Sequence, residues 1–448
     1  MYPPQLSDAH WKYNPLQPDA YLLHLGATQA HTGARAAEDI YNSQHHLILE
    51  KDTALTAAVA ANMMRLYLGK PLEESIQLQW QLDAKKLLAD LTGVMQRDDI
   101  FLAVNERYNY LFLLSPLCRL VEEFPVLQQK LTIMSLAMPD IYERTLYCVW
   151  LSLCIAKEMR LSQEDTAQVA FAALLHDIGM LHVDATLLRQ RGAISPEEWQ
   201  QIQQHVTISF QLLKATKNLP SAIAYAVYEH HEQSDGTGYP LGKLENELGL
   251  AGQIINVADA IIAIHFNYEN YQGRSWRHVI PLIHMNAQAY LTRANEMLLA
   301  IVRRSDLPVK NVVQGDAAPE FVEALLQKNA ELRNWFAELR ESLVSIGYTH
   351  GDKRLHALQN VMLHLATAAS GSGIFNELHT ELLVGEQMES EQLAQQVEKM
   401  HLLQQEIIFH LQRLSRMTQL YLDSGECKNQ EIRSALAQGL KRTQKYLP

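Results

Sequence analysis

The chain has 448 residues, of which 48% are hydrophobic and 20% charged, and its net charge is −12. This length has room for roughly two or three domains with their own cores, and the acidic balance disfavours broad binding to nucleic acid or anionic membranes. Four cysteines without CxxC spacing disfavour a disulfide framework, and neither a signal peptide nor an apolar run of membrane-spanning length is recognisable. We therefore expect a cytoplasmic protein with no membrane span and no nucleic-acid partner.

The N-terminal part is predicted to be a small α/β region. Two short strands are expected, around 37–41 and 47–50, with His45 and His46 in the turn between them. From Ala57 to about Met138, apolar residues recur at steps of three and four, which is the spacing of helices. We divide this part into an α/β region, 1–95, and connecting helices, 96–136.

The middle of the chain contains two clear helix starts. Ser162 precedes Gln-Glu-Asp and an apolar run, as an N-cap residue does. Ser195, Pro196 and Glu198 supply an N-cap serine, a proline at the first helical position and a glutamate at the third, which together form a capping box. Both signals predict helices in a mainly α segment.

The C-terminal region, 281–448, is predicted to be a helical extension. The small-residue stretch ASGSG (369–373) indicates a loop or hinge within it. Between Leu393 and Tyr421 the apolar residues fit helical spacing over about four heptads. Such a helix either binds a protein partner or a second copy of the chain as a coiled coil, or packs within its own bundle, which is the commoner outcome.

Six histidines and aspartates fall where helical spacing predicts a buried surface: His176, Asp177, His205, His230, His231 and Asp259. Asp259, for example, shares a helix face with Ile255 and Ile262. A single buried histidine is usually a satisfied core residue, but an unpaired buried carboxylate costs several kcal/mol or loses its charge. Shared divalent metal ions lower this joint cost, and these ligand types favour Fe, Mn, Zn or Ni over Ca. The six residues therefore predict a metal site.

Three motifs occur in order: HDIG (176–179), HHE (230–232) and DGTGYP (235–240). Together they resemble the signature of HD-GYP domains, a branch of the HD phosphohydrolases, over about 139–266. The resemblance implies a helical metal-binding domain, which we place at 137–280, that hydrolyses the bacterial second messenger cyclic di-GMP to pGpG or GMP. It also implies that the six residues above are metal ligands, with Asp177 as the bridge and His176 and Asp177 at the catalytic centre.

The DGTGYP segment is implied to bind the substrate through Asp235, Gly236, Gly238, Tyr239 and Pro240. Its two glycines permit tight backbone turns, and the rigid Tyr-Pro pair shapes a wall beside the ligand.

The chain departs from the family pattern at several positions. Arg144 stands where the family has a further histidine, and a guanidinium cannot ligate a metal, although it can bind phosphate. Met180 replaces the lysine of HDIGK, and the arginine expected after the last aspartate comes late, as Arg274. Asp140 matches an upstream carboxylate ligand of some members.

Two functions follow from this pattern. The first is a phosphodiesterase for cyclic di-GMP or a related nucleotide, using one or two divalent transition-metal ions per chain, Fe or Mn, and slowed by the departures. The alternative is a catalytically impaired module that regulates signalling by binding a nucleotide or a protein. Hydrolysis of a different phosphoester is less favoured, because the GYP loop is present.

Overall fold

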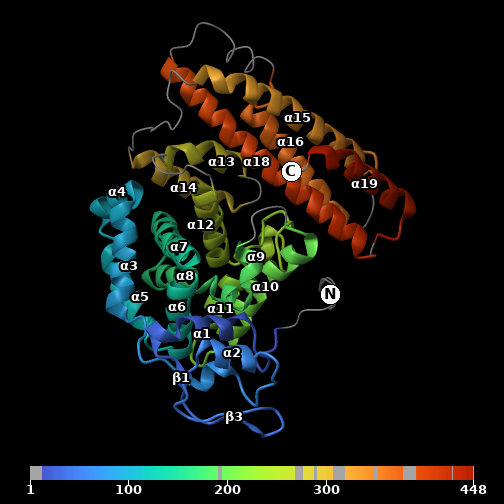
Figure 1. Cartoon of the computed structure of the whole chain (residues 1–448). Helices are drawn as coiled ribbons and strands as arrows, with labels where there is room; N and C mark the ends of the chain where they lie inside the picture. The colour runs from blue at the N-terminus through green and yellow to red at the C-terminus, as the bar shows by residue number, and fades with distance from the viewer. Residues whose placement is uncertain are drawn as a thin grey trace. The chain divides into compact units, whose positions relative to one another are not determined.

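The computed structural model is mainly α-helical, as the sequence predicts (Figure 1), and it describes residues 13–189, 194–267, 276–286, 290–305, 318–347, 352–376, 390–425 and 427–446. Its contacts divide the chain into two compact units. Unit 1 comprises Met1–His231 and Gly249–Ile262, and unit 2 comprises Glu232–Leu248 and Ala263–Pro448. The four-segment division made from the sequence stays a prediction.

The N-terminal part of unit 1 mixes short helices and strands: α1 (Ala20–Thr32), β1 (Arg35–Ala36), β2 (Ile40–Tyr41), β3 (Leu47–Leu49), α2 (Ala57–Met63), η1 (Leu72–Glu74) and β4 (Ile76–Gln77). β2 pairs antiparallel with β3, and β1 pairs antiparallel with β4. His45 lies between β2 and β3 with a positive φ of 60°. The predicted α/β character and the turn at His45 and His46 are therefore confirmed, although the strands are shorter than expected.

Helices form the rest of unit 1: α3 (Ala84–Arg97), α4 (Asp99–Tyr108), α5 (Leu111–Val121), α6 (Pro125–Ala137), α7 (Pro139–Glu158), α8 (Gln163–Leu175), η2 (Ile178–His182), α9 (Ala185–Arg189), α10 (Pro196–Ala215), α11 (Ser221–Tyr228) and the first part of α12 (Leu250–Asn267). α8 packs against α7 and α11, and α10 packs against α11 and η2. Ser162 caps α8, and Ser195 and Glu198 form the predicted capping box at the start of α10. Both predicted helix starts are confirmed.

A buried charged network ties the N-terminal region to η2, the short helix that follows Asp177. Lys130 Nζ lies 2.6 Å from Glu73 Oε1 and 2.9 Å from His182 Nε2, and His182 Nδ1 lies 2.7 Å from Asp19 Oδ2. Lys130 is fully buried, and burial lowers the pKa of its ammonium. Because loss of one partner would leave a buried charge without compensation, this network holds η2 firmly against the N-terminal region.

Unit 2 consists of the segment that contains η3 (Glu245–Glu247), the end of α12, and a set of further helices: η4 (Trp276–Val279), α13 (Ile280–Met285), α14 (Thr292–Arg304), α15 (Ala318–Val344), α16 (Lys353–Ser372), α18 (Ser390–Asp423), α19 (Gln430–Thr443) and η6 (Gln444–Tyr446). α18 packs against α15, α16 and α19 (Figure 1). Its apolar residues Leu403, Ile407, Leu411 and Leu414 are buried in the core of unit 2. The bundle alternative for this helix is therefore confirmed.

The loop predicted at 369–373 is wrong. α16 continues through Ser372 and ends at Gly373, whose φ of 70° is the left-handed cap conformation. Ala369 is buried in the bundle core, so packing overrides the weak helix propensity of the serine and glycine residues around it. None of the described helices has the length and apolar character that a membrane span needs.

Candidate metal centre

The six predicted ligands all lie in unit 1, on four helical elements. His176 and Asp177 directly follow the apolar helix α8, and His205 lies within α10. His230 and His231 come just after α11, and Asp259 lies within α12. The histidines at 176, 205 and 230 are almost fully buried. Because α11 packs against both α8 and α10, side chains far apart in the sequence meet in the interior.

The three most buried imidazoles are fixed in one tautomer by the backbone. Nδ1 of His176 and of His205 lies 2.7 Å from the carbonyl oxygen three residues earlier, and Nδ1 of His230 lies 2.5 Å from its equivalent. A carbonyl oxygen can only accept, so in each ring Nδ1 carries the proton. In the neutral imidazole, Nε2 then presents a lone pair. Metal-binding histidines are oriented in this way.

The Nε2 atoms face one another and the carboxylates. His205 Nε2 lies 3.4 Å from His230 Nε2 and 3.3 Å from Asp177 Oδ1. His176 Nε2 lies 3.3 Å from Asp177 Oδ2 and 3.7 Å from Asp259 Oδ1. Among the described residues, His176 Nε2 and Asp177 Oδ1 are buried atoms without a hydrogen-bond partner. Lone pairs that face lone pairs are repulsive unless a cation lies between them, so this donor set fits a bound divalent metal ion.

Two overlapping groups of ligand atoms are close enough to share an ion. One is formed by His205, His230 and His231, and the other by His176, Asp177 and His230, with all ligand atoms of a group within 4.8 Å of one another. Imidazole nitrogen and carboxylate oxygen are ligands that suit transition metals such as Fe, Mn and Zn.

The pKa shifts of these groups are of two kinds. Burial by itself would lower the pKa of His176, but the neighbouring Asp177 outweighs it and raises that pKa well above its usual value. Burial lowers the pKa of His230 well below its usual value and that of His231 to about 3. Burial by itself would raise the pKa of Asp177 and Asp259, but the neighbouring His176 outweighs it and lowers both. Neutral imidazoles and ionised carboxylates are the forms that bind metal ions, so His230, His231 and the two carboxylates are already in that form, whereas His176 would release a proton on binding a metal ion.

Arg144 acts on this centre through its charge. It lies on α7 and is half-buried. Burial raises the pKa of Asp259, and the guanidinium contributes to the opposing decrease, after the larger effects of His176 and His231. It also adds to the lowering of the pKa of His231, which burial dominates. Arg144 therefore places a fixed positive charge close enough to influence two of the candidate ligands.

Ser209 supports the centre, and sequence reasoning missed it. Its Oγ donates to the backbone oxygen of His176 at 2.9 Å and accepts from the backbone nitrogen of Gly179 at 2.8 Å. A Cβ atom on Gly179 would lie 2.1 Å from the backbone oxygen of His205, so only glycine allows α10 to approach this closely. The available signal was that Ser209 follows His205 by four residues and so shares its helix face.

A second pair of polar side chains fixes α12 to the segment that carries the two adjacent histidines. Glu229 Oε2 accepts from the backbone nitrogen of Gly249 at 2.7 Å. Asn256 Nδ2 donates to the backbone oxygen of His230 at 2.8 Å. Asn256 precedes Asp259 by one helical turn, so these bonds help to set the position of that carboxylate.

The predicted substrate-binding residues of the DGTGYP motif, 235–240, lie within a loop of unit 2, residues 232–248, that is held by internal hydrogen bonds. Thr237 donates to Asp235 Oδ1 from its backbone nitrogen at 2.9 Å and from its hydroxyl at 2.6 Å. Glu232 is fully buried and accepts the backbone N–H groups of residues 241 and 243. Gly236 has a left-handed φ of 78°, and a Cβ atom on Gly238 would lie 2.3 Å from the backbone at the start of the loop. Both glycines are required by this conformation.

The other residues singled out in the sequence differ in their burial. Tyr239 and Pro240 are half-buried and are joined by a cis peptide bond. Asp140 is exposed in the first turn of α7, and Met180 is half-buried in η2. Arg274 lies outside the described residues.

Comparison with known proteins places this centre in a family. The family model described as "HD domain" matches residues 129–273. The chain is 39% identical over 116 residues to "Cyclic di-GMP phosphodiesterase" of Thermotoga maritima, a match that covers 26% of this chain and 32% of that protein. It is 36% identical over 110 residues to "3'3'-cGAMP-specific phosphodiesterase 3" of Vibrio cholerae, which covers 25% of this chain and 24% of the relative. A solved HDG"Y"P protein of Bdellovibrio bacteriovorus is similar at 18% identity and a TM-score of 0.34, over 49% of this chain and 71% of that one.

The chain therefore contains an HD domain. Within the matched residues, 129–273, the motifs HDIG, HHE and DGTGYP have the pattern of an HD-GYP domain. All six candidate ligands and the whole loop lie within the matched residues, 129–273, whereas α15, α16, α18 and α19 lie beyond them. The match spans less than a third of the length of the two named relatives, so it describes this domain and not the rest of the chain.

Proposed function

We propose that this protein is a metal-dependent phosphodiesterase that hydrolyses cyclic di-GMP to pGpG or GMP. The observation that carries the proposal is the buried cluster of lone pairs directed toward one another, above all His205 Nε2 and His230 Nε2 at 3.4 Å with Asp177 beside them. Such an arrangement is unfavourable without a cation. The matched relatives are named as phosphodiesterases of cyclic dinucleotides, which supports the substrate class.

In this proposal, one or two Fe or Mn ions bind to the candidate ligands: His176, Asp177, His205, His230, His231 and Asp259. A bound divalent ion supplies Lewis acidity, which activates water and neutralises charge on a phosphate. The two oxygens of Asp177 face different histidines, Oδ1 toward His205 and Oδ2 toward His176, and this supports a bridging role. The carbonyl bonds to Nδ1 keep the rings from rotating, so the lone pairs stay directed inward.

The remaining residues would bind and orient the nucleotide. Arg144 offers a fixed positive charge for a phosphate oxygen. The loop that contains Asp235, Gly236, Gly238, Tyr239 and Pro240 starts one residue after the ligand His231, and by its resemblance to the family it lines the substrate.

A second candidate function is nucleotide binding without turnover, in which the protein acts as a signalling regulator. The observation that favours it is the influence of Arg144 on Asp259 and His231. A permanent cation beside two ligands repels a metal ion and lowers its affinity.

Metal analysis together with a turnover assay tests the proposal. Purified protein should contain Fe, Mn, Ni or Zn. In the presence of reductant and Mn or Fe it should hydrolyse cyclic di-GMP. The Asp177→Ala variant should contain no bound metal and should not hydrolyse cyclic di-GMP. Metal-free protein without turnover under these conditions would exclude the enzyme. Retained binding of cyclic di-GMP would then favour the second function. Arg144→His with Met180→Lys should raise the metal content if these two departures slow the enzyme.

A further inference from the structure

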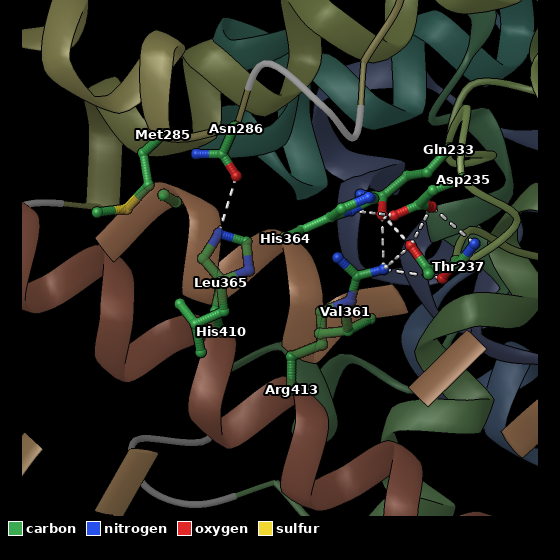
Figure 2. A pocket seen from close by; sticks show the side chains of 11 residues that line it. Gln233, Asp235, Thr237, Met285, Asn286, Val361, His364, Leu365, His410 and Arg413 are labelled. Carbon is green, nitrogen blue, oxygen red and sulfur yellow. Dashed lines mark hydrogen bonds and ion pairs between the residues drawn. The ribbon is translucent and has the colours of Figure 1, made fainter. Parts of the chain in front are cut away.

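The DGTGYP loop is held from outside by two helices of unit 2, α16 and α18. Both helices lie beyond residue 273, where the match to the HD family ends. Figure 2 shows Gln233, Asp235 and Thr237 of the loop directed toward His364 of α16 and Arg413 of α18. The loop is therefore in contact with a part of the chain that the family comparison does not describe.

Arg413 makes the larger set of contacts. A single nitrogen, Nη2, donates to Gln233 Oε1 at 2.7 Å, to the backbone oxygen of Thr237 at 2.8 Å and to the hydroxyl oxygen of Thr237 at 3.1 Å. Hydrogen bonds from a charged donor are shorter and stronger than neutral ones. Arg413 thus joins the start of the loop to the residue between its two glycines.

His364 holds the other polar residue of the motif. Its Nδ1 lies 2.6 Å from Asp235 Oδ2, while the second carboxylate oxygen accepts from Thr237. Asn360, one turn earlier on α16, donates to the backbone oxygen of Asp235 at 3.4 Å. Burial would raise the pKa of Asp235, but the hydrogen bonds from His364 and Thr237 lower it below its usual value. The carboxylate therefore stays ionised and bonded on both sides.

The cavity between these side chains is too small for a nucleotide. It has a volume of about 20 Å³ and is also lined by Asn286 and His410, which bond to each other at 2.8 Å (Figure 2). This space is about that of one water molecule. Nη2 of Arg413 and Nδ1 of His364 are already bonded to the loop, so the cluster fits a mechanical role better than a second ligand site.

We infer that Arg413 and His364 are positioning residues: they fix the DGTGYP loop in one conformation from the C-terminal helices. The loop follows His231 directly in the chain, and under the proposed function it binds part of the substrate. The catalytic consequence rests on the proposed phosphodiesterase function, whereas the structural consequence does not.

The test compares variants of the full-length, metal-loaded protein. Arg413→Met keeps the length and packing of the side chain but removes the three bonds, and His364→Gln removes the partner of Asp235 through a different helix. Both should increase amide hydrogen exchange of residues 232–248 at least about tenfold, which corresponds to the loss of one charged hydrogen bond. Bound metal per chain should be unchanged, and the KM for cyclic di-GMP should rise about tenfold with a smaller change in kcat.

Two further variants separate positioning from general damage to the helix. Arg413→Lys should restore most of the protection and of the KM, because the three bonds come from one nitrogen that an ammonium group can replace. Lys399→Met removes a positive charge from the same helix, away from the loop contacts, and should leave both quantities as in the wild type.

The outcomes are distinct. If Arg413→Met and His364→Gln fold but leave the exchange of 232–248 and the KM as they are, the inference is wrong. A different pair of results would also contradict the inference. In that case Arg413→Met lowers the hydrogen-exchange protection of α18 and the loop together, while His364→Gln leaves the loop protected. A wild-type protein without turnover would overturn the proposed function alone, and the exchange measurement would still decide whether these residues position the loop.

Discussion

Unit 1 and unit 2 each contain a cluster of histidines and carboxylates, and the two clusters differ in how their polar atoms are paired. In unit 1, His205 Nε2 faces His230 Nε2 at 3.4 Å. In unit 2, His364 Nδ1 lies 2.6 Å from Asp235 and His410 Nε2 lies 2.8 Å from Asn286. The first cluster therefore has the donor set of a candidate metal site, whereas in the second the histidine nitrogens named here already have hydrogen-bond partners. The same side chain is therefore a ligand or a structural support according to the atoms that surround it.

Replacing one aspartate by asparagine in each cluster should give the largest difference between the two clusters in metal content and turnover. Asp177→Asn removes the charge that faces three imidazoles, so we expect loss of bound metal and a fall in turnover on the order of 1000-fold, well beyond the 10–100-fold typical of residues that only support ligands. Asp235→Asn should leave the metal content unchanged. Metal analysis and a kinetic assay measure both, and equal metal loss in the two variants would contradict the distinction.

A methyl group added to one glycine in each region should act locally. Gly179→Ala forces the backbone of α10 away from the turn after Asp177, because Cβ would lie 2.1 Å from a carbonyl oxygen. We expect a loss of about 3 kcal/mol in the free energy of unfolding, as for a severe overpacking change, together with lower metal affinity. Urea denaturation and metal titration measure these two quantities.

Gly238→Ala is the matched change in the loop of unit 2, where Cβ would lie 2.3 Å from a backbone nitrogen. It should increase hydrogen exchange of 232–248 and spare the metal affinity. Reduced metal binding in this variant would argue against separate roles for the two glycines.

His265 is a third kind of histidine, in neither cluster. It stacks on Trp276 with ring centroids 4.0 Å apart, and burial lowers its pKa from 6.5 to about 3. Between pH 7 and 5 the unfolded chain takes up a proton at this residue and the folded chain does not, so stability falls as the pH falls, by about 2 kcal/mol for this group. His265→Phe should remove that part of the slope. Urea denaturation in EDTA at both pH values measures it, and an unchanged slope would show that the ring titrates normally.

The smallest effect is expected at His410 of unit 2. His410→Leu leaves Asn286 Oδ1 without its bond, at a cost of about 1–2 kcal/mol. Added Mn²⁺ should not offset this loss, because the site is complete without an ion. If Mn²⁺ stabilised the wild-type cluster and the variant did not respond, the cluster would itself be a metal site. Thermal unfolding with and without the ion distinguishes the two results.

The candidate ligands could be named from the sequence because each is a polar group on an apolar helical face, where it is costly unless something binds it. The residues that hold these ligands in place could not be predicted from the sequence. Ser209 and Asn256 are ordinary helical polar residues, and their partners are backbone atoms of His176 and His230. Which backbone atom a side chain reaches depends on how the helices pack, and a single sequence does not display this.

The sequence predicted the helix starts correctly, because an N-cap depends only on residues within one helical turn. Ser162 and Ser195 cap their helices because a serine side chain bonds to a backbone nitrogen three residues on. The loop predicted at 369–373 was wrong. Its serines and glycines favour a loop, but burial of Ala369 in the bundle keeps most of the stretch helical.

The sequence by itself determined the helix starts, the order of the three motifs and the set of side chains able to bind a metal, since these depend on residue type and on spacing within a few turns. Only the tertiary structure decided that the Nε2 lone pairs face one another. It alone also decided that Arg413, 180 residues beyond Gln233, bonds to the DGTGYP loop. Bonds between such distant segments form only after the helices have packed, because burial of their apolar faces sets the directions in which polar side chains can reach.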